Sequence, residues 1–256
     1  MISLQRVTVR YGSSAAPAVL DLDLEVEQGE TLVLLGESGC GKTTTLKLIN
    51  RLVEPASGRV LLGGVNVADE DPIALRRRVV YVFQGCGLIP HLTVRQNTAL
   101  PLRLVRTSRP ERERRADAMI ELVDLPAELR GRYPHELSGG QRQRVGVARA
   151  LVTDPAVLLM DEPFGALDAL TRESLQDELL DLKARLAKTI VFVTHDLMEA
   201  LRVGDCIGVM QAGSLHQLSS PENIVQRPAT EFVRQLFASP RRQLDLLKGL
   251  DGRRQS

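Results

Sequence analysis

The first part of the chain alternates between apolar and polar residues. In ISLQRVTVR (residues 2–10) and AVLDLDLEVEQGE (residues 18–30), apolar side chains recur at about every second position. In the second segment the apolar residues fall mostly on one face, and this face comprises Val19, Leu20, Leu22, Leu24 and Val26. A period of two is that of a strand with one buried face and one exposed face. The pattern predicts half-exposed antiparallel strands.

Four later runs are continuously apolar instead, and each ends in a polar residue or glycine. They are TLVLLG (31–36), VVYVFQ (79–84), AVLLMDEP (156–163) and TIVFVTHD (189–196). Runs that are buried on both faces and separated by helical patterns are typical of a parallel sheet with helices on either side. The polar residues at their carboxyl ends then converge on one crevice.

The interval from about Gly85 to Ala150 has a different pattern of apolar and polar residues. It contains an arginine-rich, polar hinge over residues 103–115 and an apolar pattern of helical spacing over residues 116–125. Because strand-like runs are absent, the interval predicts a mainly helical insertion. Farther on, residues 206–228 predict a hairpin around Ala212 and Gly213, followed by a helix with Pro221 near its start.

Composition limits the classes of partner. A chain of 256 residues with 43% apolar content can form one large domain, or one domain with an inserted subdomain. The 33 Lys and Arg residues balance 32 Asp and Glu, so no global basic field attracts nucleic acid or an anionic membrane. Cys40, Cys86 and Cys206 have neither the number nor the spacing of a disulfide framework or zinc site. A reducing, intracellular setting follows.

Neither a targeting signal nor a membrane span is visible. MISLQRVTVRYG carries charge inside its apolar pattern, and the longest apolar runs are far shorter than the roughly 20 residues that a bilayer span needs. If the protein acts at a membrane, we expect another chain to span it.

The segment GESGCGKT, Gly36 to Thr43, fits the phosphate-loop pattern G-x-x-x-x-G-K-[ST]. It follows a predicted strand and precedes a helical pattern, as a phosphate loop does. A chance match in a tight turn would not need this context, so the context favours a true phosphate loop. Its glycines allow backbone N–H groups to surround phosphates, Lys42 supplies a positive charge, and the Thr43 hydroxyl can bind Mg²⁺.

Acids at the end of the third apolar run fit the same chemistry. Asp161 is placed to hold the magnesium ion and Glu162 to polarise an attacking water. Two acids could instead form a solvated turn or a helix cap, but a buried strand that ends beside phosphates leaves their charges in need of a cation. His195 and Gln84 end neighbouring runs at equivalent positions, which favours a functional role for both.

A second candidate anion site is HELSGGQRQR, residues 135–144. Ser138 is placed to cap a helix, and Gly139 and Gly140 permit an anion to approach the helix N-terminus closely. By itself the segment could be no more than a capped helix start. A chain that already has a phosphate loop has no evident use for a second one.

Taken in order, GESGCGKT, Gln84, LSGGQ, LLMDEP, GALD and THD resemble the ATP-binding subunit of an ABC transporter, from about residue 1 to residue 237. The resemblance implies an α/β fold with a P-loop NTPase (RecA-like) core, an antiparallel β subdomain and an inserted helical subdomain that carries LSGGQ. The expected ATPase domain is 1–238, with core and β parts at about 1–86 and 151–238, the helical insertion at about 87–150, and a tail at 239–256.

The resemblance also implies roles for single residues. Glu162 would be the catalytic base, His195 would contact the γ-phosphate, and Gln84 would contact metal and water, with Thr43 and Asp161 as the other metal ligands. Tyr11 would stack on adenine, and the alternative is a strand aromatic packed in a core. The expected nucleotide ligands are Tyr11, Gly36, Glu37, Ser38, Gly39, Cys40, Gly41, Lys42, Thr43, Thr44, Ser138, Gly139, Gly140, Gln141 and Asp168.

The implied cofactors are ATP and Mg²⁺, and the implied assembly is a head-to-tail homodimer. In such a dimer, Ser138 to Gln141 would bind the γ-phosphate of ATP held by the other copy, and Asp168 would lie in the loop that crosses the interface. The partners would be separate permease subunits and, indirectly, an extracytoplasmic solute-binding protein. The expected location is cytoplasmic, on the inner face of the cell membrane.

Three longer segments, residues 81–97, 131–151 and 220–237, resemble the branch that imports quaternary amines such as glycine betaine, choline and carnitine. Several members carry paired CBS domains after the ATPase. The chain is expected to lack them, which puts ionic-strength sensing by that module in doubt. Ile89 also departs from the phenylalanine that is usual in the branch.

Alternatives remain for several features. The arginines of residues 103–115 could form a nucleic-acid patch, but interleaved Glu111, Glu113 and Asp117 favour a salt-bridged helix face, and no nucleic acid is expected. GLIPHLTV (87–94) could contact the membrane subunit or simply pack between lobes. A lipid or lipoprotein extrusion ATPase, or an ABC ATPase acting on DNA or ribosomes, would carry similar motifs. A P-loop GTPase or kinase would leave LSGGQ without a role.

Overall fold

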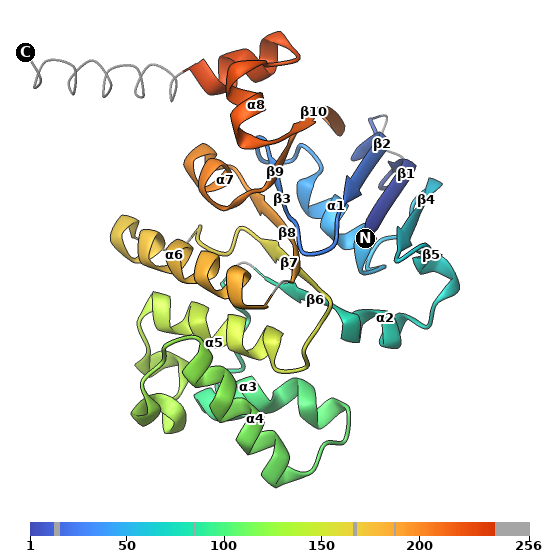
Figure 1. The fold of residues 1–256 in the computed structure, drawn as a ribbon. Helices are drawn as coiled ribbons and strands as arrows, with labels where there is room; N and C mark the ends of the chain where they lie inside the picture. The colour runs from blue at the N-terminus through green and yellow to red at the C-terminus, as the bar shows by residue number, and fades with distance from the viewer. Residues whose placement is uncertain (13–15, 84, 166–167, 187, 239–256) are drawn as a thin grey trace, which may run out of the picture.

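A computed structural model describes residues 1–12, 16–83, 85–165, 168–186 and 188–238. The fold contains two sheets (Figure 1). The four-stranded sheet has the order β2-β1-β4-β5, and the six-stranded sheet the order β10-β9-β3-β8-β7-β6. The strands are β1 (Ile2–Val9), β2 (Val19–Val26), β3 (Thr31–Leu35), β4 (Ser57–Leu62), β5 (Val65–Asn66), β6 (Val79–Val82), β7 (Val157–Asp161), β8 (Thr189–Thr194), β9 (Cys206–Gln211) and β10 (Ser214–Ser219).

The helices divide between the core and the insertion. Those around the sheets are α1 (Lys42–Ile49), α2 (Pro72–Arg78), α6 (Ala169–Leu186), α7 (Leu197–Val203) and α8 (Pro221–Gln226). Those of the insertion are α3 (Val94–Leu104), α4 (Arg109–Leu122) and α5 (Gly139–Leu151). Short 3-10 turns are η1 (Val67–Asp69), η2 (Ala127–Gly131) and η3 (Pro134–Glu136).

The four continuous apolar runs form adjacent parallel strands, as the sequence predicts. β3 pairs with β8, β8 with β7, and β7 with β6, all in parallel. Alternate side chains of β3 enter two different cores, with Leu32 and Leu34 on the face covered by α1 and Val33 and Leu35 on the face covered by α6, α7 and α8. Burial on both faces is why these strands lack a period of two.

The antiparallel sheet confirms the other strand prediction, with one exception. β1 pairs antiparallel with β2 and β4. Leu20, which the sequence placed on the apolar face, is 44% exposed. The pairing of β1 with β2 is irregular here, and Asp21 has a φ of +44°, so the strict alternation of faces is lost around this position.

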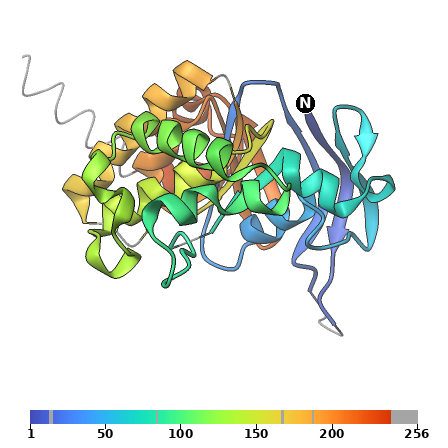
Figure 2. The same ribbon diagram turned by 90° about the horizontal axis from the view of Figure 1, so that it is seen from below.

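The insertion is helical, as expected. α3, α4 and α5 pack on one another around a small apolar core that includes Val94, Ile120 and Val145. Figure 2 shows these helices and the antiparallel sheet at opposite ends of the molecule. The hinge expected over residues 103–115 is confined to residues 105–108, because α3 ends at Leu104 and α4 begins at Arg109, with Ser108 at its N-cap and Pro110 in its first turn.

The fold class is confirmed: an α/β core, an antiparallel β part and an inserted helical part. The subdomain boundaries stay a prediction, and the expected tail at 239–256 lies outside the described residues. The expected hairpin is present, since β9 and β10 are antiparallel and joined through Ala212 and Gly213, and Pro221 begins α8. Among the described residues, no helix is long and apolar enough to cross a membrane.

Candidate functional site

The phosphate loop connects β3 to α1, at the carboxyl edge of the parallel sheet. Gly39 and Gly41 have φ values of +82° and +109°, a conformation that other residues rarely adopt. No side chain caps α1, and its first backbone hydrogen bond runs from the Thr45 N–H to the Gly41 carbonyl at 2.9 Å. The N–H groups ahead of Thr45 therefore have no partner within the helix, and they form an anion site at its positive end.

Two segments from the end of the chain support this loop. A Cβ atom on Gly36 would lie 2.2 Å from the carbonyl oxygen of Met210 in β9, so only glycine fits. The N–H group of Gly213 donates a hydrogen bond to the Cys40 carbonyl at 3.0 Å. Sequence reasoning identified the hairpin at Gly213 but not its contact with the loop, because nothing local connects positions so far apart in the chain.

Lys42 is 4% exposed and points back into the loop. Its Nζ atom donates hydrogen bonds to the carbonyl oxygens of Gly36, at 2.6 Å, and Glu37, at 2.8 Å. The third donor of the ammonium group lies 3.8 Å from the Cys40 Sγ, a weak acceptor that a phosphate oxygen can replace. The charge is thus held where the N–H groups of the loop converge.

The carboxylate of Asp161 is held from two sides. The Thr43 hydroxyl donates to Oδ1 at 2.9 Å, and the Tyr81 hydroxyl donates to Oδ2 at 2.6 Å. Burial, followed by the hydrogen bond and charge of Asp161, raises the pKa of Tyr81. Sequence reasoning brought Thr43 and Asp161 together but missed Tyr81, which it treated as one apolar position of a buried strand.

Glu162 and His195 follow the ends of neighbouring strands β7 and β8. The Nδ1 atom of His195 lies 3.3 Å from Oε1 of Glu162. Glu162 has a φ of +44°, and its N–H group donates to the Val193 carbonyl at 3.0 Å. A glutamate in the left-handed backbone region is uncommon, and this conformation costs of the order of 1 kcal/mol. The hydrogen bond to Val193 of β8 helps to hold Glu162 in it.

The second anion site starts α5. The Ser138 hydroxyl accepts a hydrogen bond from the Gln141 N–H at 3.2 Å, and the Gln141 side-chain oxygen accepts one from the Ser138 N–H at 2.9 Å. This is a capping box, and it confirms the predicted N-cap. No hydrogen bond joins residues 36–43 to residues 138–141, all of which the structure describes. Within one chain, the two anion sites are separate.

The remaining expected site residues lie at the rim or outside the description. Tyr11 is 48% exposed, and its hydroxyl oxygen lies 3.3 Å from Oγ1 of Thr44, which favours a surface position over core packing. Glu37 and Ser38 are exposed. The Asp168 carboxylate accepts hydrogen bonds from the N–H and hydroxyl groups of Thr171, within the start of α6. Gln84 lies outside the described residues.

The donor set at Asp161 fits a hard cation. Hydroxyl and carboxylate oxygens are the ligands that Mg²⁺ prefers, and in nucleotide sites one or two protein oxygens suffice because phosphates and water complete the shell. Across the described residues, no group of three or more His, Cys, Asp or Glu side chains could hold a metal by itself. Thr43 and Asp161 therefore fit magnesium that arrives with a nucleotide.

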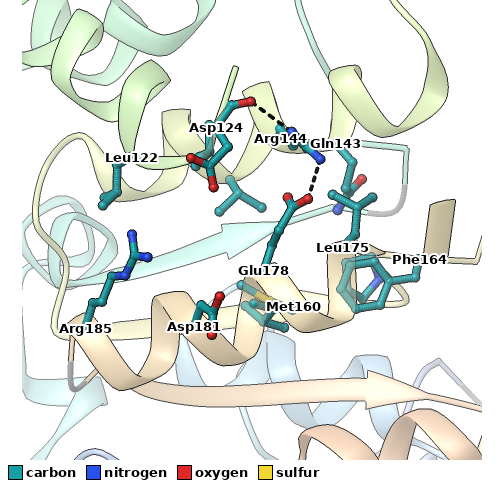
Figure 3. A pocket seen from close by; sticks show the side chains of 14 residues that line it. Leu122, Asp124, Gln143, Arg144, Met160, Phe164, Leu175, Glu178, Asp181 and Arg185 are labelled. Atoms are coloured by element: carbon teal, nitrogen blue, oxygen red, sulfur yellow. Dashed lines mark hydrogen bonds and ion pairs between the residues drawn. The ribbon is translucent and has the colours of Figure 1, made fainter. Parts of the chain in front are cut away.

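A separate cavity lies between α5, α6 and β7 (Figure 3). Its walls include Met160, Phe164 and Leu175, and Arg144 spans it by donating to the Glu178 carboxylate and, at 2.9 Å, to the Asp124 carbonyl. Burial raises the pKa of Glu178. None of the expected nucleotide or metal ligands lines this cavity. It lies between the helical insertion and the core and is not part of the phosphate site.

The sequence matches the ABC transporter family over residues 19–165. Over 241 residues it is 48% identical to the glycine betaine/carnitine/choline transport ATP-binding protein OpuCA of Bacillus subtilis, and the match covers 94% of this chain but only 63% of that protein. It is also 48% identical over 237 residues to the glycine betaine uptake system ATP-binding protein YehX of Escherichia coli, covering 93% of this chain and 76% of the relative.

Solved structures give the same result as the sequence comparisons. A dimeric ATP-binding cassette in a post-hydrolysis state with ADP and Pi has a TM-score of 0.77 to this chain at 33% identity, covering 86% of this chain and 99% of that one. Both the sequence and the arrangement of the two sheets around the phosphate loop are thus shared with such proteins. This chain belongs to the ABC transporter family, with the fold of its ATP-binding cassettes.

Proposed function

We propose that this chain is the ATP-hydrolysing subunit of an importer for quaternary amine osmoprotectants, and that it works as a head-to-tail dimer. The observation that carries the proposal is the presence of two anion sites in one chain with no hydrogen bond between them. A loop at Ser138 that makes no hydrogen bond to its own Gly36–Thr43 segment can serve that of a second copy. The solute class rests on the named relatives, whose length this chain covers only in part.

The chemistry follows from the positions of the side chains. The loop N–H groups and Lys42 hold the phosphates of ATP, and the Thr43 and Asp161 oxygens hold Mg²⁺, which supplies charge neutralisation on the phosphates. Glu162 accepts the proton of the attacking water. His195, 3.3 Å from Glu162, lies where it can contact the γ-phosphate and keep the carboxylate oriented.

The second copy completes the site. Its Ser138, Gly139, Gly140 and Gln141 bind the γ-phosphate from the opposite side, and Asp168 lies beside the interface. Closure of the dimer around ATP excludes water from the phosphates, which strengthens the electrostatic contacts there. Hydrolysis removes the γ-phosphate that joins the two copies, so the dimer opens and the cycle restarts.

The membrane partners would be permease subunits that dock near the loop after β6. Phe83 is 51% exposed and Ile73 in α2 is 63% exposed, while Asn97, fully buried, binds both the N–H and the carbonyl of Ile89 and so shapes the loop. An apolar, ordered surface suits a protein contact. The chain would then lie on the cytoplasmic face of the membrane, and a solute-binding protein would act on the other face.

The test is reconstitution with candidate permease subunits. The genes beside this one identify them, and proteoliposomes containing the complex and ATP should accumulate radiolabelled glycine betaine, choline or carnitine. A chain that hydrolyses ATP but supports no uptake of these solutes, and instead moves a lipid with a neighbouring lipid-transfer partner, would overturn the solute class. A chain that binds no ATP would overturn the whole proposal.

A further inference from the structure

Tyr81 occupies a position from which it can control the orientation of Asp161. It lies on β6, where it pairs with Leu159 of β7 in the parallel register. Leu159 and Asp161 face the same side of β7, because they are two positions apart, which is about 6.6 Å along a strand. The ring of a tyrosine spans a similar length, so its hydroxyl reaches the carboxylate at the strand end, with a donor–acceptor distance of 2.6 Å.

The ring itself is held in place. It is partly buried against the apolar cluster that contains Leu159 and Val157. The ring of Phe83 packs on it, with centroids 4.6 Å apart and an interplanar angle of 41°. A side chain fixed along its length presents its hydroxyl at one place, which is what orienting a carboxylate requires.

The two hydrogen bonds to Asp161 differ in their position relative to the expected metal. Thr43 donates to Oδ1, and its hydroxyl oxygen is also an expected ligand of the metal, so this bond lies within the expected metal shell. Tyr81 is not an expected ligand, and its bond to Oδ2 can persist throughout. It is thus a contact from outside the metal shell that can hold the carboxylate while Oδ1 faces the metal.

We propose that Tyr81 is a positioning residue that orients Asp161 for the Mg²⁺ of the bound nucleotide. The inference rests on the proposed function and adds a residue to the same site. Outer-shell partners of metal ligands typically contribute 10- to 100-fold to metal affinity or activity. The Tyr81 hydroxyl should contribute about tenfold to the part of ATP affinity that depends on magnesium.

The test uses the full chain with the Glu162→Gln substitution, so that ATP is bound but not consumed. The ATP dissociation constant is measured by calorimetry for this parent and for the same chain carrying Tyr81→Phe, once with Mg²⁺ and once with EDTA. Tyr81→Phe should weaken binding about tenfold with Mg²⁺ and leave the EDTA value unchanged. Removal of a hydroxyl keeps the ring and its packing, and a thermal melt verifies the fold.

Val80→Ala is the matched control. Val80 lies on the same strand but packs against the core on the other face, so its truncation loosens β6 without touching the carboxylate. It should leave the ratio of the two dissociation constants as in the parent. Equal weakening in Mg²⁺ and EDTA by Tyr81→Phe, or no weakening, would overturn the positioning role. If the parent itself binds ATP no better with Mg²⁺ than with EDTA, the magnesium part of the proposed function fails instead.

Discussion

The Nδ1 atom of His195 lies 3.3 Å from a carboxylate oxygen of Glu162, although the two residues follow different strands. Each residue directly follows the carboxyl end of its strand, and β7 and β8 are parallel neighbours. In a parallel sheet, neighbouring ends meet at one edge, so strand pairing itself brings the base and the histidine together.

Glu162→Gln should abolish most hydrolysis while ATP binding is kept. An amide cannot accept a proton from water, and general-base catalysis typically contributes about 10²–10⁴-fold. The trapped ATP should hold two chains together, so a dimer should appear in size-exclusion chromatography with ATP. Phosphate release measures the rate, and Glu173→Gln, on the exposed side of α6, is the control. Turnover like that of the native chain would remove Glu162 as the base.

Lys42→Ala should weaken nucleotide binding. The substitution removes a charged donor from the loop, and hydrogen bonds to charged groups contribute about 1.5–3 kcal/mol, which corresponds to roughly 10- to 100-fold in affinity. Titration with a fluorescent ATP analogue gives the constant. Lys47→Ala, in the last turn of the same helix, should bind as the native chain does. If Lys42→Ala binds ATP with native affinity, the phosphate-loop assignment is wrong.

Ser138→Arg should damage the ATP site of the other copy. In a dimer assembled from one variant chain and one native chain, the arginine would fill the space meant for the γ-phosphate bound by the native Lys42. Each chain can be tagged by a photoreactive nucleotide to show which site fails. Ser108→Arg, at the exposed N-cap of α4, is a matched control because that side chain makes no capping bond. Damage confined to the variant chain's own phosphate loop would refute the shared site.

Gly36→Ala should destabilise the fold and the loop together. The added Cβ would meet the Met210 carbonyl at 2.2 Å, and overpacking against backbone costs about 1–3 kcal/mol. Urea unfolding measures the loss. Gly131→Ala has nothing within 4 Å of the added atom and should change the free energy of unfolding by less than about 0.5 kcal/mol. Equal effects of the two substitutions would contradict the close approach of β9.

Stability should depend on Cys86 at alkaline pH. Burial raises the pKa of this thiol from 9.0 to about 11, so the unfolded chain loses the proton before the folded chain does. The folded state is then favoured fully below pH 9, and this advantage is lost as the pH rises to 11, by about 2–3 kcal/mol. Cys86→Ala should show a smaller fall in the free energy of unfolding between these values. If the free energy of unfolding changed with pH in the same way for both chains, the thiol would not be so deeply buried.

The sequence predicts most of the site because each motif is local. The phosphate loop, the acids at the end of β7 and the cap at Ser138 are all read from a few neighbouring residues. Tyr81 could not be read in this way, since its role depends on the register of β6 against β7. The support of Cys40 by Gly213 depends in the same way on a hairpin from the far end of the chain. The error at Leu20 arose from an irregularity of pairing, which periodicity does not reveal.

The capping box at Ser138 also bears on how the second anion site meets a phosphate. The Ser138 hydroxyl accepts a hydrogen bond from the Gln141 backbone N–H, and the Gln141 side-chain oxygen accepts one from the Ser138 N–H. These bonds fix the shape of the turn, while the N–H groups of Gly139 and Gly140, in the first turn of α5, have no partner within the helix. A γ-phosphate presented on another chain brings a large surface with it. In the proposed dimer the turn is therefore already shaped for binding, so little conformational freedom is lost when the opposing copy brings its γ-phosphate.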